Sequence, residues 1–346
     1  MNAKAKGLTL VAGGAGFIGS HLCRELIKAG ESVVCLDNLQ TSREANVLML
    51  EGFAGFEFVE ADITKPLPKS VLQRARQFKR VYNLACPASP PLYQADPEHT
   101  MLTNVVGTGQ LLRFAEQADA RFLLTSTSEV YGDPEVHPQP ESYRGSVSCI
   151  GPRACYDEGK RAAETLAFDF LRSGRTDVRV ARIFNTYGPN MRLDDGRVIS
   201  NLVCQALSGE PLTIYGDGSQ TRSFCYVADT VAGLRKLMEL DAPDTGPVNI
   251  GNPQEITISE LVETLEELLG ATLEICHREL PTDDPHRRRP DIGRAKELLG
   301  WRPTSSLREG LRATVAWFSE ELQRNTRAER AVVGGQRIPL MVETPA

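Results

Sequence analysis

The chain has 346 residues, of which 41% are hydrophobic and 24% are charged, and its formal net charge is −6. This length predicts about two domains, and the negative charge argues against a protein that binds nucleic acid over its whole surface. No apolar stretch reaches ~18 residues and the first residues do not resemble a cleaved leader, so we expect a soluble, cytoplasmic protein with neither nucleic acid nor membrane as a partner.

Short apolar runs alternate with amphipathic stretches along the first half of the chain. The runs predict strands at Leu8–Ala12, Ser32–Leu36, Phe56–Glu60, Arg80–Ala85, Arg121–Thr125 and Val178–Phe184. Helical patterns lie between most of them, as at 17–30 and 103–118. Continuous apolar strands that alternate with helices predict a parallel sheet covered on both faces, which is a doubly wound α/β fold of the Rossmann type.

The pattern changes after Phe184 into turn-rich segments and short helices. One such helix covers 257–270, where Thr257 or Ser259 would cap the N-terminus. We therefore predict a first domain formed by 1–185 plus about 223–250, and a smaller ligand-covering domain formed by about 186–222 plus 251–326. The tail at 327–346 has no periodic pattern and is expected to lack structure.

A glycine loop follows the first strand and opens a helix, with the spacing Gly13-x-x-Gly16-x-x-Gly19. Glycines there let the backbone approach a pyrophosphate at the positive end of the helix, although such a turn also uses glycine for packing alone. Asp37 ends the second strand at the distance expected for an acid that accepts the ribose hydroxyls. It would repel a 2′-phosphate, so NAD is predicted over NADP, while Arg43 leaves NADP open.

Tyr156 and Lys160 lie four residues apart and so share one face of a predicted helix. A lysine ammonium and an oxidised nicotinamide beside a phenol would lower the phenol pKa and make the phenol a usable base for a substrate hydroxyl. An ordinary amphipathic helix with a surface lysine is the competing interpretation. Ser126–Thr127 at a strand end and the glycine loop favour the catalytic one.

Several segments resemble the extended short-chain dehydrogenase/reductases that act on nucleotide sugars: GGAGFIGSHL, TSTSEVYGDP, CYDEGKRAAE, RIFNTYGP, YGDGSQTRSFCYV and DDPHRRRPDI. Within that family they are most similar to the UDP-glucuronic acid decarboxylases (UDP-xylose synthases), from about Leu8 to Phe318. The resemblance implies bound NAD, a UDP-sugar substrate held by the smaller domain, and a homodimer paired through helices such as 98–118 and 157–173. The NAD-binding residues are then expected to be Gly13, Gly16, Phe17, Ile18, Gly19, Asp37, Asn38, Asp62, Ile63, Leu84, Tyr156, Lys160 and Thr186.

The triplet Thr127–Ser128–Glu129 separates three chemistries within that family. The resembling 4,6-dehydratases carry Thr-Asp-Glu, the resembling 4-epimerases generally lack the glutamate, and the decarboxylases carry Thr-Ser-Glu, as here. The resemblance therefore implies NAD-dependent conversion of UDP-glucuronate to UDP-xylose, with catalytic residues Tyr156, Lys160, Thr127, Glu129 and Arg288. A 4-epimerase, a dehydratase and a catalytically silent nucleotide-sugar binder remain alternatives, and Glu129 could also be an ordinary ion-pair partner.

Substrate contacts are carried over from the same resemblance. Asn185 and Arg222 would bind the diphosphate, and Arg288 would reach either the diphosphate or the substrate carboxylate. The expected substrate-binding residues are Pro87, Ser89, Ser128, Asn185, Arg197, Asn201, Tyr215, Arg222 and Arg288. No metal is expected, because the eight cysteines form no C-x-x-C pair and the cluster around Cys276 to His286 matches no ligand spacing.

Four positions depart from the decarboxylase pattern: Leu102, Arg144, Ser148 and Cys149. They belong to a helix and a loop expected near the sugar, and a looser hold there would release a 4-keto intermediate before the reaction is complete. The sequence therefore predicts some UDP-4-keto-xylose beside UDP-xylose, with neutral substitutions at the pocket rim as the alternative.

Overall fold

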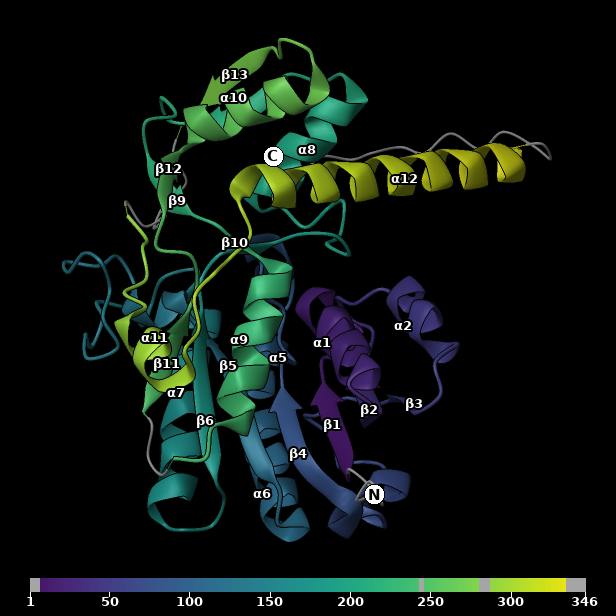
Figure 1. Ribbon diagram of the computed structural model, residues 1–346, viewed down its shortest axis with the longest axis vertical. Coiled ribbons are helices and arrows are strands. Elements are labelled where there is room, and N and C mark those ends of the chain that lie inside the picture. Colours follow the sequence, from purple (N-terminus) through teal and green to yellow (C-terminus); the bar gives the residue numbers. More distant parts are fainter. Residues whose placement is uncertain (1–6, 243–245, 280–286, 334–346) are drawn as a thin grey trace.

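The computed structural model describes residues 7–242, 246–279 and 287–333, with side chains through residue 325 (Figure 1). A seven-stranded parallel sheet forms its centre, in the order β11-β6-β5-β4-β1-β2-β3. The strands are β1 (Leu8–Ala12), β2 (Ser32–Asp37), β3 (Phe56–Glu60), β4 (Phe78–Asn83), β5 (Arg121–Thr127), β6 (Val178–Ile183) and β11 (Pro247–Ile250). The predicted doubly wound fold is confirmed. Every strand proposed from an apolar run is present, and β11 was expected only as part of the first domain.

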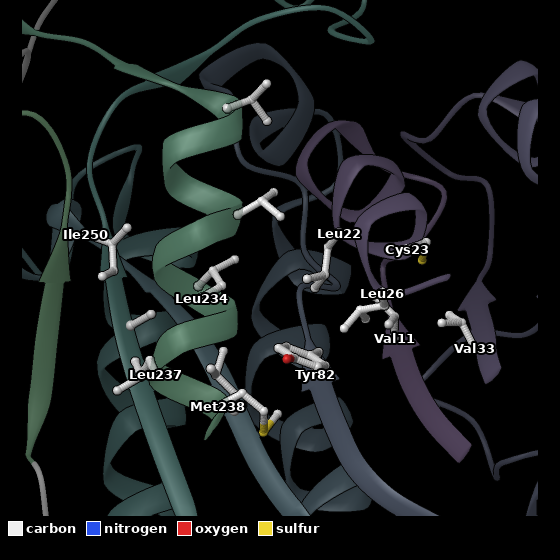
Figure 2. Close-up of a cluster of buried hydrophobic side chains, with 14 of the residues drawn as sticks. Val11, Leu22, Cys23, Leu26, Val33, Tyr82, Leu234, Leu237, Met238 and Ile250 are labelled. Atoms are coloured by element: carbon white, nitrogen blue, oxygen red, sulfur yellow. The ribbon is translucent and has the colours of Figure 1, made fainter. Parts of the chain in front are cut away.

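Alternate residues of each strand face opposite sides of the sheet, which explains why central strands such as β1 and β2 are nearly continuous apolar runs. Val11 packs with α1 (Phe17–Lys28) and α9 (Val227–Glu239) on one face, as Figure 2 shows for this cluster. Its neighbour Leu10 belongs to the cluster on the other face, under α6 (Thr108–Ala118) and α7 (Ala154–Arg172). The sheet is therefore buried on both sides.

Shorter helices connect these layers and complete the first domain. They are α2 (Glu44–Glu51), α3 (Lys69–Leu72), η1 (Ala75–Gln77), α4 (Pro90–Ala95), α5 (Pro97–Leu102), η2 (Thr103–Gly107), η3 (Ser128–Tyr131) and α11 (Gly293–Leu299). The predicted division placed α11 in the second domain, within 251–326, but its Ala295 packs in the core of the first domain with α9 and β11. Among the described residues, no helix is both long and apolar enough to span a bilayer.

The second domain has its own core, built from α8 (Val198–Ser208), α10 (Ile258–Leu269) and the start of α12 (Leu307–Val333) around β8 (Leu212–Tyr215). Three two-stranded sheets support it: β8 with β13 (Ile275–Arg278), β9 (Thr221–Ser223) with β12 (Glu255–Thr257), and β7 (Thr186–Tyr187) with β10 (Cys225–Tyr226). Thr257, one of the two expected caps, begins α10 and forms a capping box with Glu260.

The last helix, α12, passes beyond the second domain over the side where α1 and α2 lie (Figure 1). An ion pair between Arg43 and Glu321, 2.5 Å between Nη2 and Oε1, ties α12 to the loop before α2. The helix continues to Val333, past the boundary expected at residue 326. Residues 334–346 of the expected tail lie outside the described part of the chain.

Candidate active site

A cavity of about 570 Å³ opens where the carboxyl ends of the central strands meet the second domain. Doubly wound sheets bind their ligands at this edge. Every residue that the sequence analysis assigned to catalysis, cofactor binding or substrate binding contributes to the wall of this cavity. The residues that the sequence singled out therefore share one cavity.

The glycine loop needs glycine at two positions for local reasons. Gly13 has a φ of +76°, and a Cβ there would lie 2.7 Å from the backbone nitrogen of Ala85. A Cβ on Gly19 would collide with the carbonyl oxygen of Gly13. The helix that follows begins at Phe17 and its N-cap, Gly16, brings no side-chain hydrogen bond, so the first amides of α1 are left for an anion in the cavity. These features fit the pyrophosphate of a dinucleotide.

Asp37 supports the same loop from the end of β2. Its Oδ2 accepts hydrogen bonds from the backbone nitrogen of Ala15 and from Ser42 Oγ, both at 3.0 Å, and its Oδ1 accepts one from Leu39 N at 2.9 Å. Burial raises the pKa of the Asp37 carboxyl, and these hydrogen bonds act against that rise. The side chain thus positions the glycine loop and also lines the cavity where ribose hydroxyls would lie.

Arg43, the residue that left NADP open, is held by α12. Its guanidinium pairs with Glu321 and lies 5.2 Å from the ring centroid of Trp317. Because an arginine already paired with a carboxylate offers a 2′-phosphate less charge, this contact favours NAD.

Asp62 and Ile63 follow β3 and line the cavity. Asp62 accepts hydrogen bonds from Thr64 and lies 3.0 Å from His99 Nε2 on α5. Burial alone would raise the Asp62 pKa, but the bonds from His99 and Thr64 outweigh it and leave the pKa lowered. His99 also lines the cavity and did not emerge from the sequence, because a single histidine in a helix carries no spacing signal.

Tyr156 and Lys160 lie on α7 with Thr127 facing them from the end of β5. Lys160 Nζ donates to the carbonyl oxygen of Thr125 at 2.9 Å and lies 5.8 Å from the Tyr156 ring centroid. Burial raises the pKa of Tyr156, with hydrogen bonding to Thr127 as a partial offset, and burial lowers the pKa of Lys160. The protein alone therefore keeps the phenol protonated, and a further positive charge in the cavity is needed to make it a base.

A second tyrosine covers the first. The rings of Tyr93 and Tyr156 stack with centroids 5.0 Å apart and planes 6° from parallel. Tyr93 Oη and Ser89 Oγ are buried and find no hydrogen-bond partner among the described residues, and both side chains line the cavity. Buried hydroxyls without partners are costly, so these two are suited to hydrogen bonds with a ligand. Ser89 was expected from the sequence and Tyr93 was not.

Glu129 forms ion pairs with two arginines, Arg288 and Arg153. Arg288 approaches it with both Nη atoms, and its Nη2 lies 2.7 Å from Oε2; Arg153 Nη2 lies 2.7 Å from the same oxygen. Burial would raise the Glu129 pKa, but the two guanidinium groups outweigh burial and leave it lowered. Glu129 is thus both a cavity residue and an ion-pair partner, and Arg288 faces the Glu129 part of the cavity. Arg153 was not expected from the sequence.

The remaining substrate candidates are divided between the wall and the rim. Arg197 pairs with Asp195, with 2.8 Å between Nη2 and Oδ2, and lies 5.9 Å from the Phe17 ring at the start of α1. Arg222 donates to the carbonyl oxygen of Thr221, and Tyr215 is 40% exposed at the rim. Arg197 is therefore close to the anion site of the glycine loop.

The four departures from the family pattern do not belong to the cavity wall among the residues described. Leu102 is 40% exposed, Cys149 is exposed, and the carbonyl oxygen of Arg144 accepts a hydrogen bond from Arg161. Any effect of these residues on a bound sugar must therefore pass through neighbouring segments. In the part of the chain that the structure covers, no group of histidine, cysteine and acidic side chains is arranged to hold a metal ion, and Asp283, Asp284 and His286 lie outside that part.

In one cavity the chain thus combines an anion-binding glycine loop, a tyrosine beside a lysine, and a carboxylate held by two arginines. Oxidation of a sugar hydroxyl, next to an anionic group that the arginines recognise, is the chemistry that this combination supports.

Comparison with known proteins points in the same direction. Residues 9–251 match the model of the NAD dependent epimerase/dehydratase family. The chain is 54% identical to UDP-glucuronic acid decarboxylase 3 of Arabidopsis thaliana over 303 residues, which are 87% of this chain and 86% of that protein. It is 50% identical to UDP-glucuronic acid decarboxylase 1 of Xenopus tropicalis over 91% of this chain and 72% of that protein. The structure is similar to UDP-glucuronic acid 4-epimerase from Bacillus cereus in complex with UDP-glucuronic acid and NAD, with a TM-score of 0.80 and 29% identity over 91% of this chain and 99% of the epimerase.

Proposed function

The chain belongs to the NAD dependent epimerase/dehydratase family, and we propose that it is an NAD-dependent UDP-glucuronate decarboxylase that forms UDP-xylose and CO₂. The observation that carries the proposal is the position of Arg288 beside Glu129, in the same cavity wall as Tyr156. A guanidinium in that position suits a carboxylate on C6 of a sugar whose C4 hydroxyl faces the tyrosine. The relatives named as decarboxylases, at 50% identity and above, support the same activity.

Tyr156 begins the reaction by accepting the proton of the sugar 4-hydroxyl. When bound, NAD would supply the hydride acceptor for C4 and the hydride donor for the final reduction, so the cycle would have no net redox change. The positive charge of an oxidised nicotinamide would favour the ionised phenol of Tyr156, whose pKa burial raises.

Oxidation at C4 places the C6 carboxylate β to a ketone. The C5–C6 bond then breaks with its electrons moving toward the C4 oxygen, and CO₂ leaves. Thr127 and protonated Tyr156 lie where they can donate hydrogen bonds to the resulting enolate oxygen. A water held by the ionised Glu129 delivers a proton to C5 and regains one from solvent, which gives the five-carbon 4-keto sugar. Reduction at C4, with the Tyr156 proton returned to O4, then gives UDP-xylose.

The strongest rival is a 4-epimerase, because a solved relative that binds UDP-glucuronic acid is one. An epimerase must turn its 4-keto sugar within the cavity. The Thr127–Ser128–Glu129 triplet and the higher identity to decarboxylases favour decarboxylation. A silent nucleotide-sugar binder would not need the buried Tyr156 and Lys160 beside Thr127.

The deciding experiment is to incubate purified protein with UDP-glucuronate, to follow CO₂, and to separate the nucleotide sugars by chromatography before mass analysis, because UDP-glucuronate and UDP-galacturonate have the same mass. CO₂ with UDP-xylose supports the proposal. UDP-galacturonate without CO₂ identifies an epimerase, and unchanged substrate with bound nucleotide identifies a binder.

Three further properties belong to the same proposal. We propose a homodimer formed through α5 to α6 and α7, since Leu102 and Val106 expose apolar side chains there. We propose a cytoplasmic location, which suits eight cysteines that are all free. We also propose release of some UDP-4-keto-xylose, although the four positions behind that idea lie away from the cavity wall.

A further inference from the structure

Four ionisable side chains form a buried cluster beside Tyr156. Arg288 and Arg153 both bind Glu129, and Asp157 lies on the other side of Arg153, with 4.0 Å between Asp157 Oδ2 and Arg153 Nε. The side chains are between 9% and 14% exposed. Arg153, Glu129 and Arg288 line the cavity and Asp157 does not.

The two arginines share Glu129 unequally. Arg288 approaches both carboxylate oxygens, whereas Arg153 reaches Oε2 alone with its Nη2. A planar guanidinium makes one bidentate pair with a carboxylate on a given edge. If Arg288 takes the carboxylate of a bound sugar, it must therefore give up hydrogen bonds to Glu129.

A buried carboxylate that loses its cation is strongly destabilised. Among the described residues, the second cation bound to Glu129 is Arg153, which directly precedes α7 and does not belong to the segment that carries Arg288. Arg153 also has a second acidic neighbour, because its Nε lies 4.0 Å from Asp157 Oδ2 in the first turn of α7.

We propose that Arg153 is a positioning residue: it keeps Glu129 ionised and in place while Arg288 turns to the carboxylate of bound UDP-glucuronate. The inference rests on the proposed function. Arg288 exchanges Glu129 for the substrate carboxylate, whereas Arg153 stays bound to Glu129. Arg153 is therefore needed when the substrate carries a carboxylate.

UDP-glucose provides the test, because it differs from UDP-glucuronate only in a neutral group at C6. With UDP-glucose, Arg288 has no carboxylate to bind and Glu129 keeps both arginines. Arg153→Gln should therefore lower kcat/KM for UDP-glucuronate by ~10²-fold and leave the affinity for UDP-glucose, measured by calorimetry, within about twofold. Arg153→Lys retains a cation and should recover activity to within about tenfold of the wild type.

The matched control is Arg172→Gln, which removes another ion-paired arginine from α7, 66% exposed and outside the cavity. It should match the wild type with both nucleotide sugars. If Arg153→Gln lowers the affinity for UDP-glucose by the same factor as kcat/KM for UDP-glucuronate, Arg153 only supports the fold. An unchanged kcat/KM for UDP-glucuronate would also overturn the inference. If Arg153→Gln does not fold, the same comparison is made with Arg153→Lys: a loss of kcat/KM for UDP-glucuronate that exceeds the loss of affinity for UDP-glucose supports the inference, and equal losses overturn it.

Failure of the proposed function gives a different result. In that case the wild type itself releases no CO₂ from UDP-glucuronate. Where the wild type does release CO₂, the comparison of variants tests Arg153 alone.

Discussion

Arg288 and Glu129 are 159 positions apart in the chain, yet they form a bidentate ion pair inside the cavity. The pair joins the segment after β13 to the end of β5, and so connects the wall that would hold a sugar carboxylate to the residue expected near C5. Because Arg288 neutralises a carboxylate of the protein while the substrate is absent, a carboxylate on the substrate can replace it without leaving Arg288 as an unpaired buried charge.

Arg288→Ala should weaken the use of UDP-glucuronate by removing a charge-assisted contact to an anion. We expect kcat/KM to fall by ~10²-fold, with a much smaller change in the affinity for UDP, which has no sugar carboxylate. Steady-state kinetics and calorimetry measure the two effects. Kinetics with UDP-glucuronate equal to those of the wild type would show that the arginine was wrongly assigned.

Glu129→Gln should fold and bind UDP-glucuronate but convert it ~10²-fold more slowly, since a neutral amide holds and polarises the proton-donating water less well than a carboxylate does. The solvent-derived label at C5 of the product, measured in D₂O, reports this step directly. A rate like that of the wild type would leave Glu129 with only its role as a partner of the two arginines.

Tyr156→Phe should abolish the first oxidation and leave the cofactor bound. Only the phenolic oxygen is lost, and the contacts expected for the dinucleotide lie mainly at the glycine loop and at Asp37. The check is the cofactor content of the purified variant together with product analysis by mass. Normal turnover would refute Tyr156 as the base.

The first domain was predictable because short runs rich in apolar residues alternate with helical patterns along the chain. Burial on both faces leaves that signal in any parallel sheet, and it gave the six long strands from β1 to β6 to within about two residues. β11 is short, occupies the edge next to β6, and contains Asn249, whose amide is bonded to two backbone carbonyls. A run of four residues that begins with a proline is too short to be recognised as a strand.

Site residues could be predicted where they belong to a motif with a fixed spacing in one segment. They could not be predicted where their role depends on a contact with a residue far away in the sequence. Gly13, Gly16 and Gly19, or Tyr156 and Lys160, keep a fixed spacing that a single segment can show. Arg153 lies just before a helix, where an arginine is usually solvated, and its importance depends on a carboxylate from another strand end. No local pattern records that contact.

Asp157 gives a prediction for stability against pH. Burial first, and then the charge of Glu129, raise the Asp157 pKa from 3.8 to about 7. Between pH 4 and pH 7 the Asp157 carboxyl loses its proton in the unfolded chain and keeps it in the folded chain. The free energy of unfolding therefore falls as pH rises from about 4 to about 7, and above pH 7 this loss of stability stays constant. Asp157→Asn removes the effect and should raise the melting temperature near pH 8 but not near pH 4. A difference that grows toward acid pH would contradict this assignment.

The final prediction concerns cofactor choice, and it starts from the contact between Arg43 and Glu321. Arg43 lines the cavity near Asp37, but Glu321 and Trp317 of α12 hold its guanidinium. Glu321→Gln removes the opposing charge and should free part of the positive field of Arg43 for a 2′-phosphate. We expect the affinity for NADP relative to NAD to rise by roughly three- to tenfold, measured by titration of protein stripped of its nucleotide. Because Asp37 stays in place, NAD should remain the preferred cofactor. Glu320→Gln is the matched control: its neighbouring carboxylate is 67% exposed, pairs with Arg324, and should leave the ratio unchanged. An equal rise in both variants would reflect only the lower negative charge of the helix, and no rise in either would show that Glu321 does not restrain Arg43.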